Sequence, residues 1–247
     1  MKLALVTLSD GNHCRELANH VNPAKRDYCD RFGYDFIEFD RSLDPNRPAA
    51  WSKILAILQV LPHYDWVLWN DSDTLVWDSG LGLKRFIADL DEQVLVVQDD
   101  PVGINTGVFL VKNSPHIFSL LAKAYDQTQF DQHFLWEQIA IQKLLDDART
   151  TVPHVRLPIG SHAPQMQSIY NFESPPWGGG FLHLAGIRSD ERIEIVARMT
   201  RLARRPLAER LYSRNDLGDF LNRHGLLGEG VEVGVADATY SSQIMNQ

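Results

Sequence analysis

One stretch decides the fold of this chain: Tyr64-Asp-Trp-Val-Leu-Trp-Asn-Asp-Ser-Asp-Thr-Leu-Val-Trp77. Its first part is an uninterrupted apolar run, which is typical of a strand at the centre of a sheet that is covered on both faces. The run ends in Asp71 and Asp73, at the place where open α/β sheets bind their ligands. Carboxylates there favour Mg²⁺ or Mn²⁺, which would bridge to a phosphate-bearing substrate. The alternative is an Asx-type turn, in which the same two side chains cap backbone N–H groups.

Strands and helices alternate over roughly the first 190 residues. Apolar or alternating runs predict strands at 3–8, 34–39, 66–69, 94–97, 103–111, 155–157 and 181–185. Helical spacing of apolar residues predicts helices at about 15–32, 51–61, 83–90, 115–126 and 133–147. This order indicates an α/β fold with a mixed, mainly parallel sheet flanked by helices. A turn at Asn105-Thr-Gly107 within extended segments indicates some antiparallel pairing.

Three further expectations concern the helices. Pro23 should interrupt the first long helix. Cys14 and Cys29 would lie roughly 22 Å apart on that helix if it were continuous, too far for a disulfide, so reduced thiols are expected. The helix at 133–147 should bury the following apolar set: Phe134, Leu135, Ile139, Leu144 and Leu145.

The composition sets limits on function. With 247 residues and 44% hydrophobic side chains, the chain has room for one large domain, or for one domain and an appendage. A formal charge of −8 argues against a general nucleic-acid binder. It also requires any diphosphate site to gain positive charge locally, from a metal or from a few Lys and Arg side chains. Residues 1–8 are too short for a signal peptide or a membrane span, so we expect a cytoplasmic protein.

Four motifs follow one another along the chain: Trp51-Ser-Lys53; Trp69-Asn-Asp-Ser-Asp73; Gly103-Ile-Asn-Thr-Gly-Val-Phe-Leu110, with Trp136-Glu-Gln138 after it; and Phe181-Leu-His-Leu-Ala-Gly186. In this order they resemble the metal-dependent nucleotide-sugar glycosyltransferases of the GT-A fold. The most similar family includes plant xyloglucan xylosyltransferases, galactomannan galactosyltransferases and yeast mannan transferases. The resemblance covers residues 1–190 and implies a Rossmann-like GT-A domain there. It also implies transfer of a hexose or pentose to a glycan, lipid-linked or small-molecule acceptor hydroxyl.

The same resemblance assigns residues to the metal and the donor. Asp71, Asp73 and His183 would bind Mn²⁺ or Mg²⁺, and the ion would neutralise the donor diphosphate. The donor is expected to be a nucleotide-diphosphate sugar, with a UDP-sugar favoured over a GDP-sugar. The residues expected to contact it are Thr7, Lys53, Asn70, Asp71, Ser72, Thr106, Gly186 and Arg188.

The residues expected on the sugar and acceptor side are Asn105, Glu137 and Gln138. Related enzymes retain the anomeric configuration, and a side chain near the position of Gln138 lies under the reacting carbon. Because an amide is not an ordinary nucleophile, the resemblance favours front-face attack by the acceptor hydroxyl. A covalent intermediate on Glu137 is the alternative.

Structural alternatives exist for several of these residues. His183 could be a hydrogen-bonded core histidine, Lys53 a structural lysine and Arg188 a solvated surface charge. Glu137 and Gln138 could be the solvated face of an amphipathic helix. Two other functions also remain open, namely a catalytically silent GT-A module and a phosphatase of the haloacid dehalogenase type. The phosphatase motif D-x-D-x-T fits less well, because Thr74 follows Asp73 directly.

The residues from 191 onward differ in character and are expected to form a mostly helical C-terminal extension, 191–247. Within it, Gly230-Val-Glu-Val-Gly-Val-Ala-Asp-Ala-Thr-Tyr-Ser241 resembles the first strand and glycine loop of S-adenosylmethionine-dependent methyltransferases. One strand cannot form such a cofactor site, so no methyltransferase activity is expected in this chain. The segment indicates instead that a longer protein could carry a fused methyltransferase domain.

Overall fold

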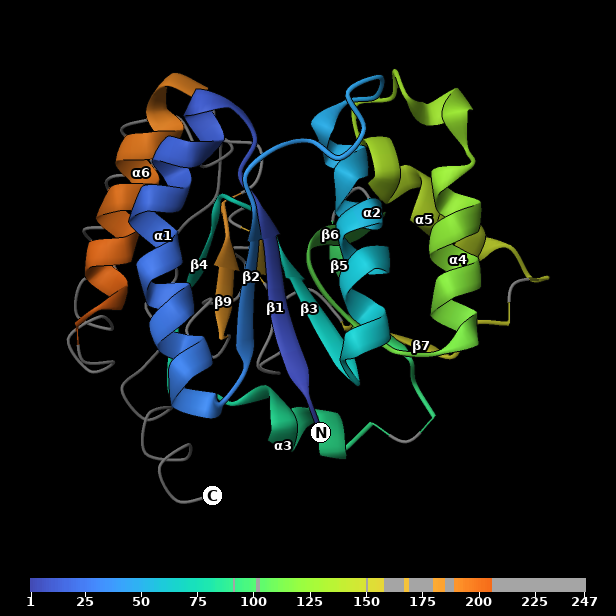
Figure 1. The fold of residues 1–247 in the computed structure, drawn as a ribbon, viewed down its shortest axis with the longest axis horizontal. Coiled ribbons are helices and arrows are strands. Elements are labelled where there is room, and N and C mark those ends of the chain that lie inside the picture. The colour runs from blue at the N-terminus through green and yellow to red at the C-terminus, as the bar shows by residue number, and fades with distance from the viewer. Residues whose placement is uncertain are drawn as a thin grey trace, which may run out of the picture.

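The computed structural model describes residues 1–90, 92–100, 103–149, 151–157, 167–168, 180–184 and 189–205. Its centre is a six-stranded sheet (Figure 1). The strands run in the order β2 (Asp35–Phe39), β1 (Leu3–Leu8), β3 (Trp66–Asn70), β6 (Gly103–Lys112), β5 (Leu95–Asp100) and β7 (His154–Leu157).

All strands of this sheet run parallel except β6, which is antiparallel to both β3 and β5. The predicted mixed, mainly parallel sheet is therefore confirmed. The predicted antiparallel pairing is also correct, but the turn that suggested it is not present. Residues 105–107 lie within the continuous strand β6, because pairing on both sides keeps the backbone extended through Gly107.

A second, smaller sheet begins directly after Asp73. It contains β4 (Thr74–Val76), β9 (Phe181–His183) and β8 (Gln167–Ser168), in the order β4-β9-β8. The segment from Asp71 to Asp73 is thus the short connection between the two sheets. Because β9 pairs antiparallel with β4, His183 stands opposite Thr74 and beside this connection.

Helices cover the large sheet on both sides, with α1 and α6 on one side and α2, α4 and α5 on the other (Figure 1). The helical elements are α1 (Gly11–Phe32), η1 (Ala49–Trp51), α2 (Ser52–Val60), η2 (Leu61–His63), α3 (Leu83–Ala88), α4 (Pro115–Tyr125), η3 (Thr128–Phe130), α5 (Trp136–Asp146) and α6 (Ser189–Ala203). None of the helices within the described ranges is long and apolar enough to cross a membrane.

Two predictions about the helices are wrong. Pro23 lies inside α1 without interrupting it, because buried side chains on both sides of the proline, among them Val21 and Tyr28, hold the helix against its neighbours. Helix α5 begins only at Trp136, so Phe134 precedes it and is exposed. The stripe that α5 does bury consists of Glu137, Ala140, Ile141 and Leu145. Cys14 and Cys29 are free thiols, as predicted.

Helix α6 packs closely on the rest of the fold. Its apolar side chains Ile195, Val196 and Met199 form one buried cluster with Leu17 and Val21 of α1 and with residues of β4 and β9. The helix begins at Ser189, so the predicted boundary at residue 190 falls inside its first turn. The segment 230–241, which resembles a methyltransferase, lies outside the described residues.

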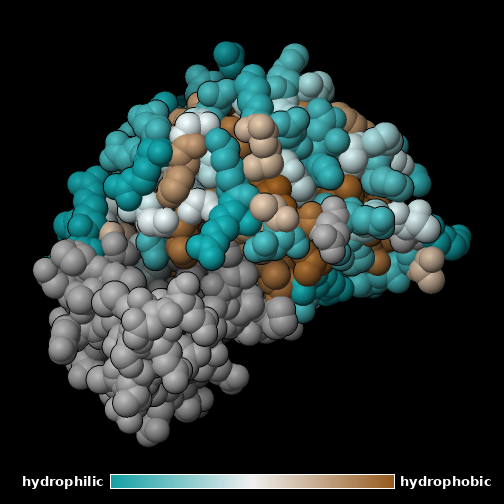
Figure 2. Space-filling model, turned by 90° about the horizontal axis from the view of Figure 1, so that it is seen from below, coloured by the Kyte–Doolittle hydropathy of each residue, from teal (hydrophilic) through white to brown (hydrophobic). Residues whose placement is uncertain are grey.

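The amino ends of β1 and β3 lie at the bottom of Figure 1, and their carboxyl ends lie at the top. Figure 2 shows the bottom face, where apolar side chains are scattered among hydrophilic ones outside the grey region. The predicted ligand-binding residues lie at the other end, where strand β3 ends in Asn70 and is followed by Asp71.

Candidate active site

The segment that follows β3 is held by main-chain hydrogen bonds. The amide of Asp71 donates to the carbonyl of Gly107 on β6 (2.8 Å), and the amide of Thr74 donates to the carbonyl of Asp71 (3.1 Å). The Asp71 carboxylate, in contrast, accepts its hydrogen bonds from side chains, with Trp69 Nε1 at 2.6 Å and Lys53 Nζ at 3.4 Å. An Asx-type turn therefore does not describe Asp71, whose carboxylate faces other functional groups.

The structure brings together the three predicted metal ligands. His183 Nε2 lies 3.3 Å from Asp73 Oδ1 and 3.8 Å from Asp71 Oδ2. One atom from each side chain can be chosen so that all three lie within 4.8 Å of one another. Asp73 and His183 are buried, whereas Asp71 is partly exposed. The cluster therefore has a closed inner side and an open side at Asp71.

Charge within this cluster shifts the pKa values of its members. Burial alone would lower the pKa of His183, but the carboxylates of Asp73 and Asp71 outweigh it, so the pKa is raised. Burial alone would raise the pKa of Asp73, but His183 and Arg192 outweigh it, so the pKa is well below its usual range. Asp73 is therefore an ionised carboxylate.

Asn105 orients the imidazole of His183. Its Oδ1 accepts from the amide of Gly107 (2.9 Å), which fixes the orientation of the side-chain amide, and it lies 3.0 Å from His183 Nδ1. Because a carbonyl oxygen can only accept, Nδ1 carries a hydrogen, and Nε2 is the nitrogen that faces the carboxylates and is available to an ion once it is deprotonated. This is how metal-binding histidines are usually held. Asn105, which we predicted on the sugar side, thus positions His183.

Gly107 belongs to one of the four motifs, but the sequence predicted no role for it in the site. A Cβ atom at this position would lie 1.9 Å from His183 Cε1 and 2.3 Å from Nδ1. The imidazole therefore occupies the space of the missing side chain. A glycine in the middle of a strand often marks such a close approach, and this was the available signal.

Lys53 joins three elements beneath the open side of the cluster. Its Nζ donates to Glu137 Oε1 (2.6 Å) on α5 and to the carbonyl of Thr106 (2.9 Å) on β6. It also lies 3.2 Å from Asp71 Oδ1. Burial would lower the pKa of Lys53, but Asp71 and Glu137 outweigh it, so the pKa is raised. Lys53 therefore carries a positive charge and fixes Asp71.

Glu137 and Gln138 have different surroundings although they are neighbours. Glu137 is only 3% exposed, and its Oε1 also accepts from Thr106 Oγ1 (3.0 Å). Its carboxylate is thus occupied by Lys53 and Thr106, which favours a positioning role. Gln138 is half-buried, and its Oε1 accepts from the amide of Thr106 (3.1 Å).

Replacing Lys53 with methionine should lower the free energy of unfolding by about 3–5 kcal/mol, because it leaves Glu137 buried without its cation. Adding Glu137→Gln should recover at least half of that loss. Urea denaturation measures both effects, and Lys123→Met, at an exposed position of α4, is the control. A loss of under about 1 kcal/mol in the single Lys53 variant, as is usual for a surface residue, would contradict this role.

Two basic residues near the acidic pair were not predicted. Lys25, from the middle of α1, is fully buried and donates to the carbonyl of Asp71 (2.9 Å); burial lowers its pKa to about 7, although Asp73 and Asp71 oppose this effect. Arg192, from the first turn of α6, places Nη1 3.5 Å from Asp73 Oδ2. The predicted Arg188 and Gly186 lie outside the described residues.

The remaining predicted donor residues lie at the carboxyl ends of β1 and β3. Thr7 and Asn70 are completely buried, and their side-chain polar atoms have no hydrogen-bond partner within the described part of the chain. Val6 pairs with Trp69, so Thr7 and Asn70 are next to each other in the sheet. They form part of the floor of the site, whereas Ser72 is partly exposed. The crevice between β1 and β3 is the point where the strand order reverses, and such points bind ligands in α/β sheets.

The negative and positive side chains at the site nearly cancel in charge before any ligand is added. The carboxylates of Asp71, Asp73 and Glu137 face Lys53, Arg192 and Lys25, and the pKa of about 7 leaves Lys25 only partly charged at neutral pH. A divalent cation would therefore add the positive charge that a diphosphate requires. Two carboxylates and an imidazole suit Mn²⁺ or Mg²⁺, and the 3.3 and 3.8 Å separations are short enough for shared ligation. Ligand atoms on one such ion lie up to about 4.2 Å apart.

The chain is similar in sequence to known glycosyltransferases. Residues 1–95 match the model of the galactosyl transferase GMA12/MNN10 family. Galactomannan galactosyltransferase 1 of Cyamopsis tetragonoloba is 32% identical over 127 residues, which are 45% of this chain and 29% of that protein. An uncharacterized alpha-1,2-galactosyltransferase of Schizosaccharomyces pombe is 23% identical over 222 residues, 70% of this chain and 58% of that protein. The chain thus spans less than two thirds of the length of either relative.

Solved structures share the fold at low sequence identity. A glycosyltransferase involved in glycosylating the major capsid of PBCV-1 superimposes with a TM-score of 0.64 at 18% identity, covering 80% of this chain and all (100%) of that chain. The bifunctional glycosyltransferase WbbM gives a TM-score of 0.52 at 14% identity, over 85% of this chain and 51% of that chain. The methyltransferase resemblance of residues 230–241 receives no support from these matches. The predicted resemblance to glycosyltransferases of the GT-A fold is confirmed, by the family model over residues 1–95 and by the shared fold over most of the chain.

Proposed function

We propose that this chain is a metal-dependent glycosyltransferase that moves a sugar from a nucleotide-diphosphate donor to an acceptor hydroxyl. The observation that carries the proposal is the convergence of Asp71, Asp73 and His183 at the carboxyl end of a GT-A sheet. The family match over residues 1–95 includes the two aspartates. Because relatives in this family are named galactosyltransferases, UDP-galactose is the first donor to test.

In this proposal the side chains of Asp71, Asp73 and His183 hold Mn²⁺ or Mg²⁺. The bound ion supplies charge that stabilises the diphosphate as the glycosidic bond breaks. Asn105 keeps His183 Nε2 on the side of the acidic pair, where it can ligate the ion. Lys53 keeps Asp71 in place through its bonds to two other elements, and Lys25 fixes the main chain of Asp71 from below.

The surroundings of Glu137 and Gln138 favour retention by front-face attack. Glu137 is buried and bound to Lys53, so it is poorly placed to act as a nucleophile. Gln138 is more open, and its carbonyl is held by the amide of Thr106, which fixes the side chain next to β6. We propose that Gln138 lies under the reacting carbon and stabilises positive charge there, while the acceptor hydroxyl attacks from the side of the leaving group.

The acceptor side is proposed to lie at the start of α5. Phe134 and Trp136 are exposed to 69% and 41%, and both stand within four residues of Gln138. Trp136 has a φ of 42°, a left-handed conformation that is unfavourable for a bulky side chain and is common at functional sites. Aromatic faces exposed in this way suit the apolar face of a sugar ring, so a glycan acceptor is favoured over a non-sugar one.

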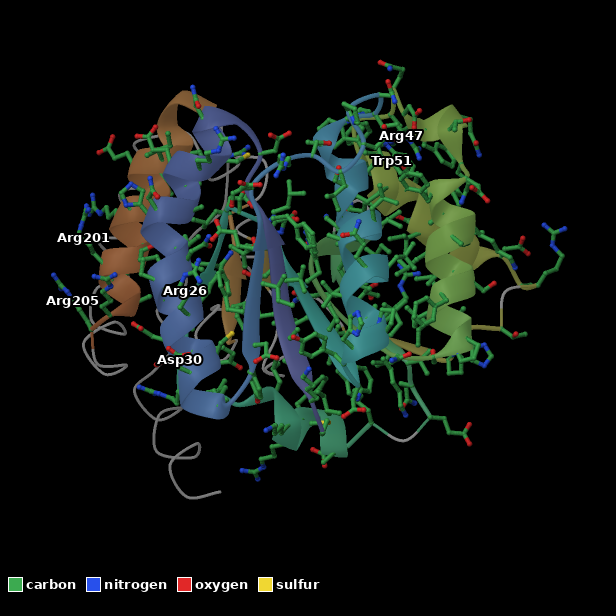
Figure 3. The ribbon with its side chains drawn as sticks, in the orientation of Figure 1. Arg26, Asp30, Arg47, Trp51, Arg201 and Arg205 are labelled. Atoms are coloured by element: carbon green, nitrogen blue, oxygen red, sulfur yellow. The ribbon has the colours of Figure 1, made fainter. Side chains whose placement is uncertain are left out.

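The segment before α5 is held in place by the loop that precedes α2. Arg47 donates from Nε to Asp131 Oδ1 (2.9 Å) and lies over the ring of Trp51, 3.6 Å from its centroid (Figure 3). His133 stacks on Phe134 with ring centroids 4.8 Å apart. The Phe134 ring is thus supported from one side by an anchored segment, which leaves its other face for a ligand.

Replacing Phe134 with alanine should raise the acceptor KM about tenfold, the loss expected for one aromatic contact of ~1.4 kcal/mol. Hydrolysis of the donor in the absence of acceptor should not change, because none of the contacts described for Phe134 reaches the metal cluster. Initial rates at varied acceptor concentrations measure the first effect, and the hydrolysis rate is the internal control. An unchanged KM would exclude Phe134 from the acceptor site.

A thermal-shift panel of UDP- and GDP-sugars, with and without Mn²⁺, tests the proposed function. We expect a shift with one nucleotide that requires the ion, followed by turnover of the same donor. A shift without turnover would indicate the silent donor-binding module instead. No shift with any donor would contradict the proposal.

The phosphatase alternative loses support. The phosphatase motif usually ends the first strand of its domain, whereas the two aspartates of this chain follow β3.

A further inference from the structure

Arg192, on α6, forms an ion pair with the candidate metal cluster. Its Nη1 lies 3.5 Å from Asp73 Oδ2, whereas Asp73 Oδ1 faces His183 at 3.3 Å. The two oxygens of Asp73 thus face different partners, the imidazole on one side and the guanidinium on the other. Although it faces the other oxygen, Arg192 neutralises part of the charge that would attract an ion to Asp73, and in this sense it competes with the ion.

The position of Arg192 is set by the packing of its helix. Ile195, Val196 and Met199, on the buried face of α6, pack in one cluster with α1 and β4. This packing holds the first turn of α6 against Asp73. The Arg192 side chain itself is 26% exposed, compared with 11% for that of Asp73, so part of it already lies at the surface.

The other two basic side chains near the acidic pair are more deeply buried than Arg192. Lys25 is fully buried and bound to the carbonyl of Asp71, and Lys53 is buried between Glu137 and Thr106. Burial and these hydrogen bonds hold both side chains in place. Arg192 combines a long contact, partial exposure and a planar guanidinium, which is the group best suited to bind a phosphate through two parallel hydrogen bonds.

We propose that Arg192 changes partner during donor binding. Without an ion it neutralises Asp73; when a divalent cation takes over Asp73, the guanidinium is released and binds the diphosphate of the nucleotide sugar. The inference rests on the proposed function and extends it. Binding of the ion then adds positive charge for the diphosphate in two ways, through the ion itself and through the released guanidinium of Arg192.

Calorimetric titration separates this role from a purely structural ion pair. Mn²⁺ alone is titrated first, and then UDP, or GDP if that is the nucleotide the wild type binds, at saturating Mn²⁺. Arg192→Ala should weaken nucleotide binding about ten- to hundredfold, since it removes hydrogen bonds to a charged group. Affinity for Mn²⁺ alone should stay the same or increase, because a competing cation is lost. Arg192→Lys should restore part of the nucleotide affinity.

Arg201→Ala is the matched control, because it removes the same charge from an exposed position of the same helix (Figure 3). It should bind both ligands like the wild type. A change of less than fivefold in nucleotide affinity for Arg192→Ala would overturn the inference, and so would an equal loss of Mn²⁺ affinity, which would indicate a damaged site. If the wild type binds neither nucleotide with Mn²⁺, the proposed function itself fails.

Discussion

Replacing Asp73 with asparagine should lower turnover of the nucleotide sugar at least about a thousandfold. The substitution keeps the shape of the side chain but removes the charge that faces His183 and Arg192. An ion held at this cluster would supply several kcal/mol of stabilisation to the developing diphosphate, and about 1.4 kcal/mol corresponds to each factor of ten in rate. Donor hydrolysis and transfer, both measured with Mn²⁺, report the loss.

Asp89→Asn is a suitable control for the loss of one negative charge, because Asp89 is exposed at the end of α3. Its turnover should equal that of the wild type. Circular dichroism and the thermal midpoint verify that the Asp73 variant is folded. If that variant is folded and still turns over the donor at more than a tenth of the wild-type rate, Asp73 does not hold the ion.

A single methyl group at position 107 should weaken Mn²⁺ binding although no metal ligand is replaced. In Gly107→Ala the new Cβ would overlap the imidazole of His183, 1.9 Å from Cε1 and 2.5 Å from Nε2. Strand β9 fixes the backbone of His183 opposite Thr74, so the ring has to rotate and leave Asn105. Mn²⁺ affinity should fall at least tenfold, as it does when groups that orient a ligand are lost.

Gly80→Ala provides the comparison for this substitution. The nearest atom to its Cβ is Asp78 Oδ1 at 3.1 Å, the end of a side chain that can move. Mn²⁺ titration by calorimetry should find wild-type affinity for Gly80→Ala and weak binding for Gly107→Ala. Equal affinities in the two variants would mean that His183 is a core histidine, the alternative that the sequence left open.

The sequence predicted the parts of the site that lie in short, ordered motifs. Asp71 and Asp73 follow an apolar strand, and the order of the motifs pointed to His183 more than a hundred residues later. The structure brings these three side chains together because β9 pairs with β4 directly after Asp73. The mixed, mainly parallel sheet could also be predicted, because each strand is recognised from a short local pattern of apolar residues.

Contacts that depend on the rotation of helices could not be predicted. Helix α5 starts three residues later than expected, and Glu137 consequently faces the interior and pairs with Lys53. Lys25 and Arg192 lie on α1 and α6, far from any motif, and reach the acidic pair only through the packing of those helices. A pattern of residue types does not define such long-range geometry.

The most direct test of the central claim is a calorimetric titration of the wild-type chain with UDP and with GDP, in Mn²⁺ and again in excess EDTA. If Asp71, Asp73 and His183 hold an ion that receives the donor diphosphate, one nucleotide binds in Mn²⁺ and its affinity falls at least a hundredfold in EDTA. Nucleotide binding of equal strength in both buffers, or none in either, would contradict the account.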